Sequence, residues 1–141
     1  MSLARAQEDL EKSIKKAQRR SRSERLKRLA EAPKRPISYA VSTTAYLRNP
    51  DVIAEVLDRA KGICESCVKP APFLRSSNGA PYLEVHHRLP LAKGGEDTVE
   101  NAIALCPNCH RERHFGTLYA SKDVASPQYA TQKNDKVESL V

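Results

Sequence analysis

The 141-residue chain has no tryptophan, and aromatic residues make up only 5% of it. Aromatic side chains bury more apolar surface than any other kind, so their scarcity implies a small hydrophobic core. A domain with a small core usually depends on a bound metal ion or on a partner for its stability. The sequence therefore predicts one small domain that a bound metal ion or a partner stabilises.

The chain also lacks a long apolar run and a leader sequence. No run approaches the roughly 20 residues that cross a bilayer, so we expect no membrane-spanning segment and no membrane partner of that kind. The first ten residues already contain Arg5, Glu8 and Asp9, which a signal peptide would not. These absences predict a cytoplasmic protein, in which cysteines favour metal ligation over disulfides.

Positive charge is concentrated at one end. The chain has 24 Lys and Arg against 17 Asp and Glu, a formal charge of +7. Residues 1–36 hold 12 basic and 5 acidic side chains, whereas residues 37–141 hold 12 of each. A basic arm of this kind favours a polyanionic partner, namely DNA, RNA or an acidic membrane surface. A solvated, solubilising helix is the alternative interpretation.

This basic arm predicts one helix from residue 3 to about residue 31. Its narrow apolar stripe repeats at spacings of three and four, at Leu3, Ala6, Leu10, Ile14 and Ala17. The stripe is interrupted at residues 19–23, and Pro33 and Pro36 end the helix and open a linker. Such a helix would pair with a second copy, lie on DNA, or fray.

The residues after the linker predict a small α+β domain. Residues 37–47 are rich in Tyr, Val and Thr and predict a strand or extended segment. Asn49 as N-cap and Pro50 at the first position predict a helix that stops at Gly62. A loop is expected at 68–80, and strands are expected at 82–86 and 102–105, with a turn at Gly94-Gly95 between them. A final helix is expected at 107–116.

The four cysteines form two CxxC pairs, Cys64 with Cys67 and Cys106 with Cys109, separated by 38 residues. A CxxC turn brings two thiolates to one ion at about 2.3 Å, and two such turns complete a tetrahedral site. We expect a structural Zn²⁺ here, because a site with four cysteine ligands has no open position for catalysis. Two redox dithiols, or four unconnected core residues, are the competing interpretations.

The four histidines also fall into two tight pairs. His110 and His114 lie four residues apart on the expected last helix, so they share one face and can address one ion or one phosphate. His86 and His87 are neighbours, which in a regular strand point to opposite faces. If the strand ends or bends there, one can bind a metal while the other reaches a water.

Together these residues resemble the HNH endonucleases, also called ββα-metal or His-Me finger nucleases. The resemblance covers residues 64–114 and is nearest to the four-cysteine subgroup of McrA-type restriction nucleases; DNase colicins are more distant. Its motif consists of Glu84-Val85-His86-His87, Pro90, Gly94-Gly95, Asn101, Leu105-Cys106, Cys109-His110 and His114. It implies an α+β nuclease domain at 37–118, after a helical arm and linker at 1–36 and before a polar tail at 119–141.

The resemblance also implies roles for individual residues. His87 is the general base that deprotonates the attacking water. His86 and His110 are ligands of one catalytic divalent cation, and His114 is a further ligand or a phosphate contact. The Asn101 amide fixes the connecting loop and orients His87. Glu84 supports the site by contacting the ligands, without binding the cation itself.

These roles suit phosphodiester hydrolysis. A neutral imidazole serves as a base near pH 7, and one cation held by few protein ligands stabilises the leaving oxygen. Imidazole ligands suit Zn²⁺, Ni²⁺, Co²⁺ or Mn²⁺, so Mg²⁺ is not singled out. Phosphate contacts are expected from basic residues near the ligands and in the arm: Arg88, Arg111, Arg113, Lys15, Lys16, Arg19, Arg20 and Arg22.

The leading hypothesis is therefore a metal-dependent endonuclease that nicks or cuts DNA, in a restriction-type role. The alternative is a non-catalytic zinc module that binds nucleic acid or protein. The chain could also be the effector part of a larger nuclease assembly, or a homodimer built through the N-terminal helix. The sequence does not reveal which base sequence or modification is recognised, or whether the substrate is DNA or RNA. It also does not reveal whether the biological role is restriction, phage packaging, homing or repair.

Overall fold

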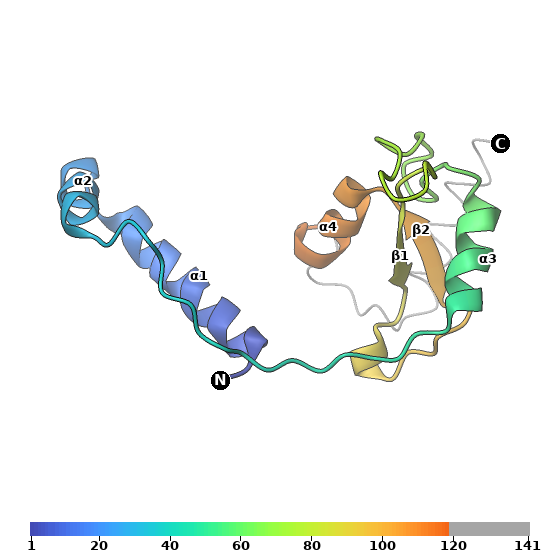
Figure 1. Ribbon diagram of the computed structural model, residues 1–141, viewed down its shortest axis with the longest axis horizontal. Coiled ribbons are helices and arrows are strands. Elements are labelled where there is room, and N and C mark those ends of the chain that lie inside the picture. Colours follow the sequence, from blue (N-terminus) through green and yellow to red (C-terminus); the bar gives the residue numbers. More distant parts are fainter. Residues whose placement is uncertain (119–141) are drawn as a thin grey trace. The chain divides into compact units, whose positions relative to one another are not determined.

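Two units make up the computed structural model, which describes residues 1–118 (Figure 1). The first unit is Met1–Tyr46, and the second begins at Leu47. The polar tail expected at 119–141 lies outside the described residues. The sequence-based boundaries at 36 and 118 stay a prediction.

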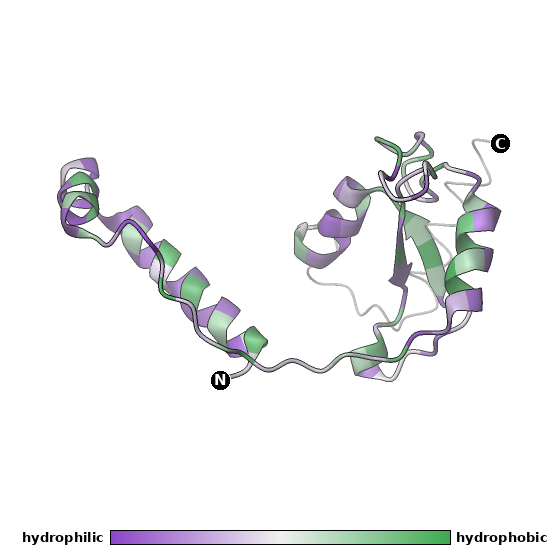
Figure 2. Cartoon of the chain, viewed as in Figure 1, coloured by the Kyte–Doolittle hydropathy of each residue, from purple (hydrophilic) through white to green (hydrophobic). Residues whose placement is uncertain are grey.

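The first unit contains two helices, α1 (Leu3–Arg19) and α2 (Arg22–Glu31), so the prediction of one helix over 3–31 is wrong. The break lies at Arg20 and Ser21, whose backbones are extended. The Ser21 hydroxyl accepts the backbone N–H of Glu24 and so begins a new helix instead of continuing the first. Neither helix buries a residue, and the apolar stripe of α1 appears in Figure 2 as green bands between purple ones.

Residues 37–47 form no strand of the sheet, so the strand alternative of that prediction is wrong. Ser42 makes one isolated parallel bridge to Ser2, with its carbonyl accepting the N–H of Leu3 at 2.7 Å. Tyr39 and Tyr46 remain 66% and 49% exposed. The high β-propensity of this stretch is not realised because a strand needs a paired edge and a surface to pack against.

The second unit opens with α3 (Pro50–Ala60), as expected. The Asn49 side chain caps it by accepting the N–H of Asp51 at 3.0 Å. Its buried residues, Val52, Val56 and Ala60, recur every four positions and form one face. The helix ends at Lys61, which is left-handed at φ 49°, and Gly62 follows at φ 76°.

A two-stranded antiparallel sheet follows, made of β1 (Glu84–His87) and β2 (Ala102–Leu105). β2 was predicted at the observed residues; β1 begins later than the expected residue 82. The register pairs His86 with Ile103 and His87 with Ala102. Every residue of β2 is buried, because α3 and α4 (Pro107–Phe115) both pack on this small sheet.

The core is as small as the scarcity of aromatic residues predicted. Its largest fully buried side chains are Leu83, Ile103, Leu105, Val56 and Cys64. The order β1, β2, α4 is a ββα unit, so the predicted α+β class is confirmed. A short 3₁₀ helix, η1 (Leu91–Lys93), lies in the loop that joins the strands. Among residues 1–118, no helix combines the length and apolar character needed to cross a membrane.

Candidate metal centres

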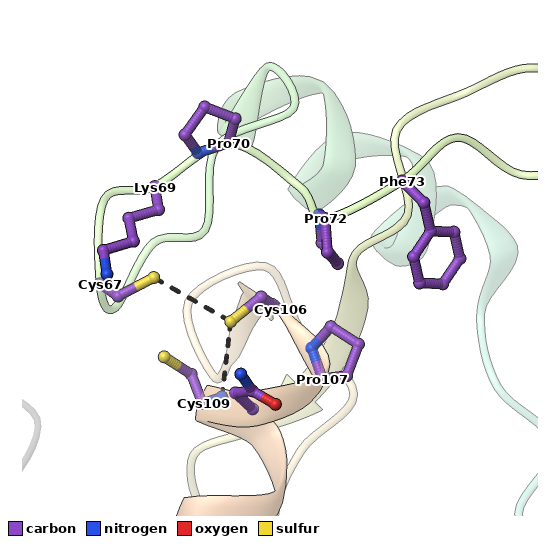
Figure 3. A pocket seen from close by; sticks show the side chains of 9 residues that line it. Cys67, Lys69, Pro70, Pro72, Phe73, Cys106, Pro107 and Cys109 are labelled. Atoms are coloured by element: carbon purple, nitrogen blue, oxygen red, sulfur yellow. Dashed lines mark hydrogen bonds between the residues drawn. The ribbon is translucent and has the colours of Figure 1, made fainter.

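The four cysteines come together at the start of α4. Their sulfur atoms lie within 4.8 Å of one another, and the sulfurs of Cys67 and Cys106 are 4.0 Å apart. Four ligands at 2.3 Å around a tetrahedral zinc would lie about 3.8 Å apart, so the cluster fits this ion. Figure 3 shows three of these sulfurs facing one another below Pro70, Pro72 and Phe73, which line a hollow of about 500 Å³.

Backbone hydrogen bonds shape the first cysteine turn. The Cys64 carbonyl accepts the N–H of Val68, and the Cys64 N–H donates to the carbonyl of Lys69, both at 2.9 Å. The turn is fixed to the sheet because the N–H of Glu65 donates to the Ala104 carbonyl at 2.9 Å. The ligands are therefore positioned by the fold.

An ion pair that sequence reasoning missed reinforces this junction. Arg59 of α3 donates from Nε and Nη2 to both carboxylate oxygens of Glu65, at 2.8 and 2.7 Å. Glu65 Oε1 also accepts the N–H of Ala104 at 2.9 Å, and Arg59 Nη2 donates to the Ala102 carbonyl at 2.8 Å. This pair joins α3, the cysteine turn and β2 in one network.

The thiols differ in their readiness to ionise. Burial disfavours the Cys64 thiolate, but hydrogen bonds from the backbones of Cys106, Cys67 and Ser66 outweigh it and lower its pKa to about 7. Burial and the neighbouring sulfurs raise the pKa of Cys109. A divalent cation offsets this mutual repulsion, since it stabilises every thiolate at once.

A second cluster consists of His86 on β1 with His110 and His114 on α4. Their ligand atoms also lie within 4.8 Å of one another. The rings form a nearly equilateral triangle, with centroids 5.0, 5.1 and 4.9 Å apart, and the Nε2 atoms of His110 and His114 are 3.1 Å apart. Two imidazoles on one ion at about 2.1 Å stand a little over 3 Å apart, so these residues fit a shared cation.

Glu84 orients one of these histidines. Its Oε1 lies 3.0 Å from Nδ1 of His110, and its Oε2 accepts the hydroxyl of Tyr82 at 2.8 Å. Burial opposes ionisation of Glu84, yet the hydrogen bonds from Tyr82 and His110 lower its pKa. An ionised carboxylate only accepts, so His110 carries its proton on Nδ1 and turns the lone pair of Nε2 toward the cluster.

His86 is held in the neutral form that a metal ligand needs. Its side chain is 9% exposed, and burial is the main cause that lowers its pKa to about 3. The charges of His110 and Arg113 add to the effect. Burial is also the main cause that lowers the pKa of His114, and the charge of His110 adds to it.

His87 does not join this cluster. It is 9% exposed, and its Nε2 lies 2.8 Å from Oδ1 of Asp97 in the loop between the strands. Neighbouring residues of β1 thus serve different partners, as strand geometry predicts. Asp97 was not identified from the sequence, because a single acidic residue in a polar loop carries no periodic or motif signal.

Asn101 closes the loop that carries Asp97. Its Oδ1 accepts the N–H of Leu89 at 2.9 Å, and its Nδ2 donates to the carbonyls of Leu89 and Glu96 at 3.0 and 2.7 Å. Its backbone carbonyl accepts the N–H of Arg88 at 2.7 Å. The side chain thus joins both ends of the loop and has no hydrogen bond to His87.

The basic residues lie in different environments. Arg111 is exposed and lies 5.5 Å from the ring of Phe115, Arg88 is half-buried, and Arg113 is only 8% exposed. Arg113 thus belongs to the interior, which does not suit the phosphate contact expected of it. In the first unit Lys15, Lys16, Arg19 and Arg22 are exposed and Arg20 is half-buried.

Comparison with known proteins is consistent with this geometry. Residues 64–116 match the family described as HNH endonuclease. The chain is 51% identical over 85 residues to the type IV methyl-directed restriction enzyme EcoKMcrA of Escherichia coli (strain K12), a match that covers 60% of the chain. A shorter match, 42% identical over 33 residues and 23% of the chain, is to anaredoxin of Nostoc sp..

The fold also resembles a solved structure, that of the type IV phosphorothioation-dependent restriction endonuclease ScoMcrA. The TM-score is 0.52 at 34% sequence identity, over 67% of this chain. The chain spans only 19% of the ScoMcrA chain, 30% of EcoKMcrA and 43% of anaredoxin. The similarity therefore concerns one domain of longer proteins.

Proposed function

Because residues 64–116 form a domain of the HNH endonuclease family, we propose that this chain hydrolyses phosphodiester bonds of DNA with the help of one divalent cation. One observation carries the proposal: His86, His110 and His114 converge on one point, while the adjacent His87 is buried and held by a carboxylate. A zinc module with only a structural role would not need the three-histidine cluster or the buried His87 beside it.

The side chains divide the chemistry between them. His87 accepts a proton from the water that attacks the phosphorus. His86, His110 and His114 would hold the cation, and Glu84 keeps His110 in the ligand tautomer. A divalent cation bound there supplies positive charge that stabilises the phosphorane-like transition state and the leaving oxygen. Asn101 holds the loop beside His87, and Arg111 and Arg88 are the phosphate contacts that suit their exposure.

The four cysteines are proposed to bind a structural Zn²⁺. The cluster fits a closed tetrahedral site and joins both ends of a domain whose core is small. Anaredoxin matches only a short segment of the chain. A nuclease domain stabilised by zinc also explains the histidine cluster.

The substrate class is proposed from the relatives. One is named as methyl-directed and the other as phosphorothioation-dependent, so we propose that the chain acts in restriction of modified DNA. The shared region is a minor part of each relative. Recognition of the modification is therefore assigned to a further domain or partner, and the basic residues of α1 and α2 would add sequence-independent affinity.

Plasmid nicking tests the activity. Supercoiled DNA is incubated with the full chain and Mg²⁺, Mn²⁺, Ni²⁺, Co²⁺ or Zn²⁺, beside His87→Ala. Loss of the general base should slow cleavage by about 10²–10⁴-fold and leave DNA binding and zinc content unchanged. If wild type and variant bind DNA but are equally inert with every cation, the non-catalytic binding module is the correct function.

A further inference from the structure

A carboxylate outside the recognised motif contacts the candidate base. Oδ1 of Asp97 lies 2.8 Å from Nε2 of His87, and both side chains are largely enclosed, at 20% and 9% exposure. The second oxygen, Oδ2, accepts the backbone N–H of Asn49 at 2.6 Å. We infer that Asp97 is a positioning residue that fixes the tautomer and ring orientation of His87, an inference that rests on the proposed function.

The two oxygens of Asp97 have two separate tasks. Asn49 is the N-cap of α3, a helix packed on the sheet, so the bond from its N–H anchors the carboxylate to a rigid element. On the other side, Nδ2 of Asn101 holds the carbonyl of Glu96, the residue just before Asp97. Asn101 therefore orients His87 indirectly, by placing Asp97.

The ionisation state of Asp97 decides where the proton of His87 lies. The hydrogen bond from the Asn49 backbone, followed by that from His87, lowers the pKa of Asp97 below its usual value. At neutral pH the carboxylate is ionised and can only accept, so Nε2 of His87 must donate. A neutral His87 then has its lone pair on Nδ1.

This tautomer suits the proposed step. Nδ1 of His87 takes one proton from water as the water oxygen forms a bond to phosphorus. The bond from phosphorus to the leaving oxygen breaks with its electron pair on that oxygen, which takes a proton from a solvent water molecule. His87 becomes an imidazolium whose second N–H points at Asp97, so the carboxylate stabilises the charge that the step creates.

The Asp97→Asn variant tests this role. An asparagine has one acceptor oxygen and one donor NH₂ group, so it cannot accept from both His87 and Asn49. We expect kcat to fall by about 10-fold or more, but by no more than in His87→Ala, with KM changed by less than about 2-fold. The matched control is Glu100→Gln, which removes one exposed carboxylate from the same loop and should leave kcat unchanged.

A double variant separates positioning from a general structural effect. If Asp97 acts through His87, then Asp97→Asn should cause no further loss of kcat in the His87→Ala background. A loss that multiplies with that of His87→Ala would overturn the inference, as would an unchanged kcat in Asp97→Asn alone. Thermal melting and zinc content of each variant identify failure to fold.

One measurement needs no variant. Long-range ¹H–¹⁵N spectra of the full wild-type chain, at mildly alkaline pH, report which nitrogen of His87 is protonated. The inference requires the Nε2–H form, and the Nδ1–H form would overturn it. Should the wild type cleave no DNA with any cation, the proposed function fails, while these spectra still decide whether Asp97 places the proton.

Discussion

At the residue scale, two carboxylates bind opposite ring nitrogens of two histidines. Glu84 lies at Nδ1 of His110, which leaves Nε2 free to face the histidine cluster, while Asp97 lies at Nε2 of His87, which leaves Nδ1. Under the proposed function, the same imidazole group would serve as a ligand in one place and as a base in the other, since the partner selects the tautomer.

Burial of His86 should make the cation-free protein sensitive to mild acid. Its pKa is about 6.5 in the unfolded chain and about 3 in the folded one, so between these two pH values the unfolded chain binds the proton and the folded chain does not. The free energy of unfolding should therefore fall as pH decreases from 6.5, by up to about 1.4 kcal/mol per pH unit. Urea unfolding between about pH 7.5 and pH 5.5 measures this slope.

The comparison for this slope is His86→Asn, which has no titrating group at that position and should show a flatter dependence. Zinc content is checked at each pH, so that loss of the cysteine-bound ion is not mistaken for the effect. Parallel slopes in wild type and variant would contradict the assigned burial of His86.

Residue identity and spacing predicted the pairs within each cluster, because their members recur at intervals that a turn or a helix brings together, whereas the family resemblance grouped His86 with His110 and His114. Cys64 with Cys67, and His110 with His114, are examples. Asp97, Tyr82 and the ion pair of Arg59 with Glu65 could not be predicted this way. His87 and Asp97 are ten residues apart across a loop, Arg59 and Glu65 are six residues apart across the end of α3, and Tyr82 is two residues from Glu84. No helical period or metal-ligand spacing marks these pairs in the sequence.

At the scale of the elements, the loop between β1 and β2 determines where Asp97 meets His87, the proposed base. Gly95 is essential to this loop for steric reasons. A β-carbon at this position would stand 1.9 Å from the Leu89 carbonyl oxygen and 2.8 Å from that of Pro90. The loop can follow this path only with glycine here.

Gly95→Ala should therefore destabilise the domain by about 3 kcal/mol and reduce cleavage together with stability. Gly79→Ala is the matched control, because Gly79 has φ of 71° with nothing within 4 Å of an added β-carbon. Backbone strain alone should cost about 1 kcal/mol there and leave cleavage unchanged. Chemical denaturation measures both, and equal losses would refute the steric argument.

Elements with local start and stop signals were predicted well. Asn49-Pro50 and Cys106-Pro107 begin α3 and α4 where expected, and the apolar run of β2 marks that strand. The two errors have different causes. Ser21 caps a second helix where the stripe is interrupted, which is a local signal that the prediction of one helix overlooked. Residues 37–47 have strand propensity without an edge that would pair with them along their length, so tertiary context decides there.

At the scale of the whole molecule, the net positive charge and the two candidate metal clusters lie in different units. The basic side chains of α1 and α2 are in the first unit, and both clusters are in the second. Replacing Lys15, Lys16, Arg19, Arg20 and Arg22 by glutamine should weaken DNA binding without changing kcat at saturating DNA, since none of them belongs to the clusters.

Salt dependence measures the contribution of these residues. For each basic side chain that binds a phosphate, its replacement should reduce the slope of log affinity against log salt by about 0.9. An unchanged affinity and slope in the five-fold variant would exclude the arm from DNA binding. Solution mass measured on the same samples tells whether the arm acts in a homodimer.

If one domain holds two ions with separate tasks, as we propose, cleavage should depend on one ion and the folded structure on the other, so ions are counted while cleavage is assayed. The full chain is treated with a mild chelator, its zinc content is measured, and nicking is assayed before and after a cation is restored. We predict that about one zinc per chain is retained, that cleavage is lost, and that it returns with the added cation. Cleavage that persists without a second cation, or that disappears only when the zinc is removed, would show that no second ion takes part in cleavage.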